Sequence, residues 1–215
     1  MRIFIVHAHH EPQSFNSAMT RVSSEALAAA GHEVVISDLY AMGFDPVSDR
    51  RNFTTVQDPI YLKQQTEELH ASRSAGFTPD VHREMEKLAD CDLLILQFPL
   101  WWGGLPAILK GWADRVLACG VAYGGGRWFD SGVFTGKRAM CALTTGGSPD
   151  LFAEGGLNGP LEAILHPIHH NILRFVGFTV ESPFVVHAPA RLDDNERRRQ
   201  LAAYAAQVLR LASAP

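Results

Sequence analysis

Residues 92–106, DLLILQFPLWWGGLP, are the stretch from which the rest of the chain is interpreted, because a strand-like apolar run ends there in an unusual turn. Two tryptophans and two glycines stand close together between Pro99 and Pro106. An indole ring offers a large flat face, glycine lets a backbone approach closely, and proline stiffens the chain. The combination predicts a loop that binds a planar, aromatic ligand. Taken alone, Trp101 and Trp102 would serve equally well as anchors of a core or an interface.

Strand-like and helix-like segments alternate along the chain on both sides of this stretch. Apolar runs predict strands over residues 2–8, 32–39, 92–98, 137–145 and 178–187. Apolar spacing and helix-boundary residues predict helices over 14–30, 78–91, 106–119 and 193–212, and further helices near 59–71 and 158–175. Such alternation indicates an α/β fold, a doubly wound five-stranded parallel sheet in the flavodoxin-like order 2-1-3-4-5 with helices on both faces. We expect a single domain over residues 1–215, with an insertion at about 40–77.

The composition limits the partners and the compartment. The 215 residues carry a net charge of −4 and 47% of them are hydrophobic, which allows a full core and disfavours a nucleic-acid partner. Cys91, Cys119 and Cys141 are isolated and lack CxxC spacing, which indicates a reducing compartment rather than a disulfide scaffold. No run is long and apolar enough for a signal segment or a membrane span. We therefore expect a soluble, cytoplasmic protein.

Three loops should meet at the edge of the sheet where parallel strands end and where such folds bind ligands. They read HAHHEPQSFNSAM (7–19), FPLWWGGLP (98–106) and TTGGSPDLF (144–152). In the first, Ser14 begins a helix whose free N–H groups attract phosphate, although Ser14 alone is equally well explained as a helix N-cap. Neither GxxxxGKS/T nor GxGxxG occurs, which disfavours a nucleotide hydrolase and a dinucleotide fingerprint.

The same stretches carry a resemblance that covers nearly the whole chain. In AHHEPQSFNSAM (8–19), EVVISDLYAMGFDP (33–46), LQFPLWWGGLPAILKGWADRV (96–116), TTGG (144–147) and ILRFVGF (172–178), it resembles the NAD(P)H:quinone oxidoreductases of the flavodoxin-like fold. The resemblance implies a homodimer with one FAD per subunit and an active site at the interface. It also implies two-electron, ping-pong transfer of a hydride from NAD(P)H through the flavin to a quinone.

The resemblance also assigns roles to individual positions of this chain. The positions that should contact the cofactor are His9, Ser14, Phe15, Asn16, Ala18, Pro99, Leu100, Trp101, Trp102, Gly103, Asp114, Thr144, Thr145, Gly146, Gly147, Phe152, Arg197 and Leu201. Of these, the 9–18 group should hold the pyrophosphate, the 99–103 group should line the isoalloxazine ring, and Arg197 and Leu201 should meet the adenosine. Tyr123, Phe175 and Asn158 should line the substrate pocket. Gly146 and Asn158 occupy the positions closest to the chemistry.

Some positions depart from the family pattern. Phe152 and Asn158 stand where many members have a tyrosine and a histidine, and neither side chain can titrate. We therefore expect water or the substrate to supply the proton, while backbone amides at the polar edge of the flavin stabilise negative charge. Gly103 replaces a large aromatic residue, which should enlarge the pocket.

Other functions use the same motifs and stay as alternatives. An azo- or nitroreductase of similar fold would hold FMN, and a non-catalytic flavoprotein would act as an electron carrier or a regulatory subunit. The tryptophan pair and the insertion favour a walled pocket over an exposed flavin edge. Histidines cluster at 7–10 and 166–170, but Arg174 follows His170 by one turn, where a further metal ligand would be needed. We expect no metal site.

Overall fold

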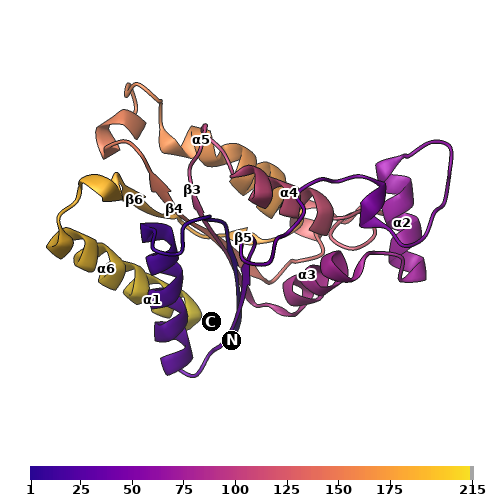
Figure 1. Ribbon diagram of the computed structural model, residues 1–215, viewed down its shortest axis with the longest axis horizontal. Coiled ribbons are helices and arrows are strands. Elements are labelled where there is room, and N and C mark those ends of the chain that lie inside the picture. Colours follow the sequence, from indigo (N-terminus) through magenta and orange to yellow (C-terminus); the bar gives the residue numbers. More distant parts are fainter. Residues whose placement is uncertain (214–215) are drawn as a thin grey trace.

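A parallel sheet forms the centre of the molecule. In the computed structural model, which describes residues 1–213, the strands β1 (Arg2–His7), β2 (Glu33–Asp38), β3 (Leu93–Pro99) and β4 (Arg138–Thr145) pair in the order β2-β1-β3-β4 (Figure 1). Each pairing is parallel, with Ile5 beside Ile36 and Ile95, and Ile95 beside Met140. The predicted flavodoxin-like strand order is confirmed.

The outermost strand differs from the prediction for residues 178–187. Two short strands, β5 (Thr179–Val180) and β6 (Phe184–His187), occupy the segment, and both pair with β4, which gives a six-stranded sheet. Pro183 lies in the break and has no N–H to give to the ladder. The segment keeps its predicted place in the sheet but not its continuity.

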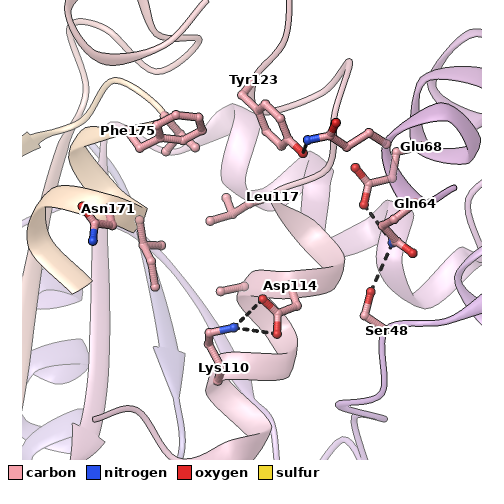
Figure 2. A pocket seen from close by; sticks show the side chains of 13 residues that line it. Ser48, Gln64, Glu68, Lys110, Asp114, Leu117, Tyr123, Asn171 and Phe175 are labelled. Carbon is pink, nitrogen blue, oxygen red and sulfur yellow. Dashed lines mark hydrogen bonds and ion pairs between the residues drawn. The ribbon is translucent and has the colours of Figure 1, made fainter. Parts of the chain in front are cut away.

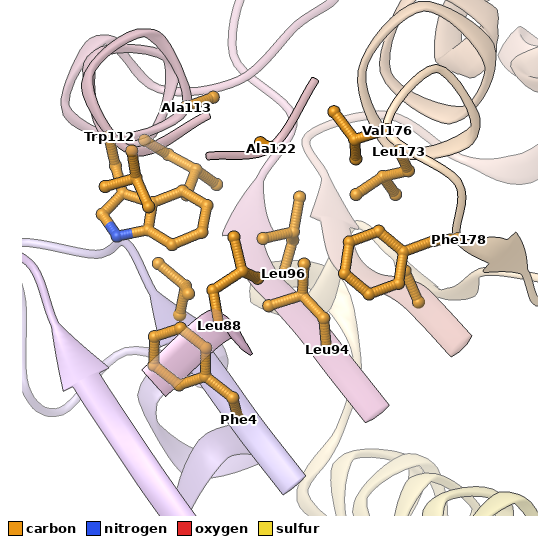
Figure 3. Packing of buried hydrophobic residues seen from close by; sticks show 14 of the residues in the cluster. Phe4, Leu88, Leu94, Leu96, Trp112, Ala113, Ala122, Leu173, Val176 and Phe178 are labelled. Carbon is orange, nitrogen blue, oxygen red and sulfur yellow. The ribbon is translucent and has the colours of Figure 1, made fainter. Parts of the chain in front are cut away.

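Alternating side chains of the strands divide between two hydrophobic clusters. Phe4, Leu94 and Leu96 face one cluster, and Ile3 and Ile95 face the other, as expected for a sheet buried on both sides. The first cluster lies under α3 (Pro79–Asp90), α4 (Ala107–Val116) and α5 (Leu161–Ile168), and the second under α1 (Phe15–Ala29) and α6 (Asp194–Ser213) (Figure 1). Figure 3 shows the first cluster, in which the ring of Trp112 from α4 meets the edge of Phe4.

A buried carboxylate connects three elements on the first face. Glu84 of α3 is fully buried and accepts hydrogen bonds from Trp112 Nε1 of α4 at 2.9 Å, from Ser37 Oγ of β2 at 3.0 Å and from Lys87 Nζ at 2.5 Å. Because a buried charge is tolerated only when it is paired and hydrogen-bonded, this site fixes how α3 and α4 sit on the sheet.

The insertion at about 40–77 contains a short 3₁₀ turn, η1 (Arg50–Asn52), and one α-helix, α2 (Gln64–Ser74). The helix begins later than predicted, because Asp58 Oδ1 accepts the N–H groups of Ile60 at 2.8 Å and Tyr61 at 3.1 Å and holds them in a turn. Arg115 of α4 fastens the insertion to the domain by donating to Asn52 Oδ1 and to the carbonyl of Asp45, both at 2.7 Å.

The helix predicted near 158–175 is divided at Ile168. It runs as α5 and then as a π-helical segment, η4 (His169–Arg174). Pro167 inside α5 has no N–H and crowds the preceding turn, which disfavours regular continuation of the helix. Three further 3₁₀ turns are η2 (Phe129–Ser131), η3 (Pro149–Phe152) and η5 (Pro189–Arg191). Within residues 1–213, none of the helices has the length and apolar character to cross a bilayer.

Candidate functional site

The carboxyl ends of β1, β3 and β4 meet at one edge of the sheet, as the sequence predicts. A cavity of about 480 Å³ opens there, between the first turn of α1, the end of β4 and the start of α6. All the residues of the predicted pyrophosphate and adenosine groups line it. The lining consists of His9, Gln13, Ser14, Phe15, Asn16, Ala18, Thr144, Pro189, Ala190, Arg197 and Leu201.

The first turn of α1 supplies the donors that suit an anion. Ser14 is the N-cap, and its Oγ accepts the N–H of Ser17 at 3.1 Å. The N–H groups of Phe15 and Asn16, at the first two helical positions, have no acceptor within the helix. A phosphate at this point would receive both N–H groups and the positive end of the helix dipole. Ser14 therefore caps the helix and also lines the cavity, so its role as N-cap leaves the predicted contact with an anion open.

The side chain of Asn16 has a different task from its backbone. Its Oδ1 accepts from Gln97 Nε2 at 2.7 Å, and its Nδ2 donates to Thr144 Oγ1 at 2.7 Å. Asn16 is buried, as are Gln97 and Thr144. Asn16 can therefore meet an anion through its backbone N–H, while its amide holds the loops after β1, β3 and β4 in one arrangement.

The stretch FPLWWGGLP forms a tight turn after β3. Leu100 N donates to the carbonyl of Thr144 at 2.8 Å, and Trp101 and Gly104 exchange backbone hydrogen bonds at 3.2 and 3.0 Å. Trp102 and Gly103 both have positive φ, +52° and +69°, which is the conformation that glycine adopts without strain. The indole of Trp102 is fully exposed, so it packs in no core formed by residues 1–213.

Trp101 connects this turn to the first cavity. Its ring centroid lies 5.9 Å from that of His9 and 5.8 Å from that of His10. Burial lowers the pKa of the His9 imidazole, and the neighbouring His10 ring adds to the effect. A neutral His9 against an indole gives the rim of the cavity a flat aromatic surface.

The two glycines of the TTGG turn after β4 differ in how much space lies beside them. A Cβ at Gly146 would meet no atom within 4 Å, so the space beside it is free for a ligand. A Cβ at Gly147 would lie 2.8 Å from Leu151 Cδ1 and 3.2 Å from the ring of Phe152, so this glycine is needed for packing. Thr145 is engaged internally, because its Oγ1 donates to the carbonyl of Gly147 at 2.8 Å.

The residues after this turn provide no titrating side chain at the two positions where the family has them. The ring of Phe152 lies 5.6 Å from that of His187, and Asn158 is exposed, with its backbone N–H bonded to the carbonyl of Leu151. His187 Nδ1 lies 3.0 Å from Thr145 Oγ1, and burial lowers the pKa of this imidazole. Sequence reasoning overlooked His187, which is the histidine closest to this turn.

Three of the predicted site residues lie elsewhere in the chain. Asp114, Tyr123 and Phe175 line a second cavity of about 640 Å³, which shares no lining residue with the first (Figure 2). The rings of Tyr123 and Phe175 lie 5.6 Å apart, whereas Asp114 accepts from Lys110 Nζ at 2.6 and 2.8 Å. Asp114 is thus paired with a lysine and is not brought to the first cavity.

The insertion gives the second cavity a polar wall that the sequence did not reveal. Gln64, Gln65 and Glu68 of α2 face it (Figure 2), and Gln65 Nε2 donates to Tyr123 Oη at 3.3 Å. Glu68 accepts from Gln64 Nε2 at 2.8 Å and from the N–H of Cys119 at 2.7 Å. Burial raises the pKa of Glu68. The polar pattern of α2 is the only signal in the sequence, and any exposed helix would show it.

Comparison with known proteins shows the family to which the chain belongs. A family described as having a flavodoxin-like fold matches residues 1–210. The human ribosyldihydronicotinamide dehydrogenase [quinone] is 38% identical over 204 residues, which are 94% of this chain and 88% of that protein. Rat NAD(P)H dehydrogenase [quinone] 1 is 44% identical over 188 residues, which are 87% of this chain and 69% of that protein. Among solved structures, a Klebsiella pneumoniae protein assigned as a quinone reductase superposes with a TM-score of 0.95 at 37% identity, covering 99% of this chain and 85% of that one.

Proposed function

The chain belongs to the family of flavodoxin-like fold that includes NAD(P)H dehydrogenases (quinone), and from this premise we propose that it is an FAD-dependent NAD(P)H:quinone oxidoreductase. The observation that carries the proposal is the first cavity, where the free N–H groups of α1, the Thr144 hydroxyl and Arg197 line one hollow. Three free cysteines suit a reducing compartment, and we expect the protein to act in the cytoplasm.

The residues present fit a flavin. Donors at the start of α1 suit a phosphate, the open side of Gly146 leaves room for a flat ring, and Trp101 with His9 offers an aromatic rim. The cavity therefore suits an anion at one end and a planar ring at the other. A flavin carries both features in one molecule.

The length of the cavity favours FAD over FMN. FMN ends at the phosphate, which we place at the first turn of α1. Arg197 and Leu201 of α6, together with Pro189 and Ala190 of η5, extend the lining beyond that point. These residues would contact only the adenosine half of FAD.

When bound, the flavin supplies the hydride chemistry, accepting from NAD(P)H and delivering to a quinone. The chain would hold the ring between Trp101 and the TTGG turn, and the backbone N–H groups of Gly146 and Gly147 would stabilise negative charge on it. Phe152 and Asn158 hold no titrating proton, so water or the substrate protonates the product. A single pocket that serves donor and acceptor in turn implies ping-pong kinetics.

A homodimer would bring the two cavities together. Tyr123 and Phe175 form an apolar wall suited to a flat quinone, yet their cavity is separate from the first one in a single chain. We propose that the second cavity of one subunit faces the flavin of the other. The fully exposed Trp102 supports an interface on this side of the sheet.

The purified protein tests the proposal directly. Its absorbance should show a flavin, mass spectrometry of the released cofactor should give FAD, and anaerobic NADH or NADPH should bleach it rapidly without a stable one-electron band. A benzoquinone should then restore the colour. Release of FMN with reduction of azo or nitro compounds would indicate the related reductases instead, and bleaching that never couples to a quinone would indicate a carrier or regulatory protein. A folded preparation that binds neither flavin would end the proposal.

A further inference from the structure

Three buried side chains, two amides and one hydroxyl, are joined by hydrogen bonds that lead from the middle of the sheet to the first cavity. Gln97 in β3 has no exposed surface, and its Nε2 donates to Asn16 Oδ1 at 2.7 Å. Asn16 Nδ2 donates in turn to Thr144 Oγ1 at 2.7 Å. Asn16 and Thr144 line the cavity, whereas Gln97 does not. Asn16 lies in the first turn of α1, Gln97 in β3 and Thr144 at the end of β4, so these hydrogen bonds connect the segments at the ends of β1, β3 and β4.

The hydrogen bonds between these three side chains all run in one direction, from Gln97 toward Thr144. Both amides donate toward the cavity, so Thr144 Oγ1 receives a hydrogen bond and its own O–H is left to donate elsewhere. Within residues 1–213 no acceptor takes this proton, and the hydroxyl lies on the cavity wall. The Thr144 hydroxyl is thereby prepared to donate to an acceptor atom of whatever occupies the cavity.

Two further observations bear on this direction. Gln97 Nε2 also lies 3.7 Å from Met19 Sδ, a weak acceptor, which suits a nitrogen at this position and not an oxygen. Gln97 Oε1 is buried and has no hydrogen-bond partner in the described part of the protein. With both amides turned round, this oxygen would accept from Asn16 Nδ2, and the Thr144 hydroxyl would donate inward to Asn16. The direction in the structure leaves one oxygen unsatisfied, whereas the reverse would leave the N–H groups of Gln97 without an acceptor, and only the first keeps the Thr144 proton for the cavity.

We propose that Gln97 is a positioning residue which, through Asn16, sets the Thr144 hydroxyl as a hydrogen-bond donor to an acceptor atom of the bound cofactor. The inference rests on the proposed function, since the acceptor belongs to the flavin. Flavins offer carbonyl oxygens, ring nitrogens and phosphate oxygens, all of which accept hydrogen bonds. Gln97 touches none of them and acts only by fixing the direction of the hydrogen bonds from Asn16 to Thr144.

The test is a double-mutant cycle measured by flavin binding. Thr144→Val removes the hydroxyl with little change of shape, and Gln97→Met removes the polar end of the amide at similar length. We expect the dissociation constant of the flavin to rise about tenfold for Thr144→Val and about three- to tenfold for Gln97→Met, in line with the loss of one hydrogen bond. In the Thr144→Val background, Gln97→Met should have no further effect, because the hydroxyl it positions is gone.

Controls separate positioning from a structural role. Thr144→Ser keeps the hydroxyl and should bind flavin almost as the unmodified protein does, and the thermal unfolding midpoint of each flavin-free variant reports on folding. If Gln97→Met does not fold, Gln97→Leu, which is smaller and also lacks the amide, replaces it. Without the amide, Asn16 Oδ1 loses its donor and the direction of these hydrogen bonds is no longer fixed. This variant should weaken binding about as much as Gln97→Met does, and again only when Thr144 is present.

The outcomes distinguish the positioning role of Gln97 from the proposed function of the whole protein. Additive effects of the Gln97 and Thr144 substitutions, or unchanged binding in the Gln97 variants, would overturn the inference while leaving the proposed function intact. An unmodified protein that binds no flavin would instead remove the proposed function itself. Coupled effects on the dissociation constant, with recovery in Thr144→Ser, would support the positioning role.

Discussion

Arg197 is the residue that best distinguishes the two flavins. It lines the far end of the first cavity and holds the η5 loop by donating to the carbonyl of Pro189 at 3.0 Å and to that of Ala190 at 3.3 Å. We predict that Arg197→Ala raises the dissociation constant of FAD about tenfold and changes that of FMN much less, because FMN ends before this point. Titration of the flavin-free protein with each flavin, followed by fluorescence, measures both constants.

Arg198 is the matched control for this prediction. It carries the same charge one position along α6, is exposed, and bonds only to Asn195 in the described part of the chain. Arg198→Ala should leave both dissociation constants unchanged. Equal losses for FAD and FMN in Arg197→Ala would remove the reason to prefer FAD.

Glu68 and Glu67 are neighbours whose pKa values move in opposite directions. Burial raises the pKa of Glu68, so the folded protein binds its proton more strongly than the unfolded chain, and this contribution to stability falls as pH rises above about 4.3. Hydrogen bonds from the N–H of Gln57 and then of Asp58 lower the pKa of Glu67, so its contribution is present at neutral pH and is lost as pH falls. We predict that Glu68→Gln gains stability relative to the unmodified protein between about pH 4 and pH 7, and that Glu67→Gln loses it.

Urea unfolding at a series of pH values checks this pair. The informative quantity is the change with pH in the difference of unfolding free energy, since each substitution also alters local hydrogen bonds by a constant amount. The two variants should show opposite slopes. Parallel slopes would mean that the two carboxyl groups do not differ in environment as the structure indicates.

At the same scale, the sequence predicted the residues of the first cavity well and those of the second poorly. Ser14, Thr144 and Arg197 were found because helix starts, strand ends and a shared motif mark them. Gln97 was missed because a single glutamine in an apolar strand gives no sign of which loops it joins. Asp114 was placed with the cofactor by resemblance alone, and in the structure it pairs with Lys110 beside the other cavity.

Among the elements, the packing of α3 and α4 against β2 depends on one carboxylate, that of Glu84. Glu84→Ala would leave the buried Trp112 Nε1 without an acceptor and would remove the partner of Lys87. We predict a loss of unfolding free energy of about 2–3 kcal/mol, from an unsatisfied buried donor and a lost charge-assisted hydrogen bond. Equilibrium urea unfolding measures it.

Glu86 on the same helix provides the comparison. It is exposed, and its carboxylate lies 3.4 Å from Nε2 of the exposed His82. Glu86→Ala should change the unfolding free energy by less than about 0.5 kcal/mol, as is usual for exposed ion pairs. A similar loss in both variants would show that helix propensity, and not the buried carboxylate, sets the stability of this packing.

Element type and order followed from apolar periodicity, whereas the ends of elements depended on single residues outside that pattern. The strands of the sheet were predicted because a parallel sheet buried on both faces leaves continuous apolar runs. The late start of α2 depends on Asp58 taking two N–H groups, and the division at Ile168 follows Pro167. Such local hydrogen bonds compete with regular structure without changing the apolar pattern from which the prediction was made.

For the whole molecule, the decisive question is whether one active site needs two subunits. Gly146→Val should block the flavin site and still fold, because a Cβ there meets no protein atom within 4 Å and the φ of Gly146 is not positive. Asn171→Trp places a large ring in the second cavity from an exposed position (Figure 2). We predict that each variant alone is inactive and that hybrids carrying one subunit of each recover about half the activity of the unmodified dimer, since one of two sites is intact.

Different affinity tags on the two variants allow the hybrids to be purified in two steps, and quinone reduction is then measured. Sedimentation of the unmodified protein gives the subunit number independently. Inactive hybrids of correct size would show that each chain builds its site alone, and a monomer in sedimentation would exclude the shared site altogether.

The interruption between β5 and β6 has a consequence for the behaviour of the protein at high concentration. An uninterrupted border strand offers a row of unpaired peptide groups on which another chain can grow, which is how sheets polymerise into aggregates. Here the border is cut into pieces of two and four residues, and Pro183 withholds a donor at the cut. The interruption therefore makes this border a poor template for another chain, in contrast to the opposite border, which the uninterrupted strand β2 forms.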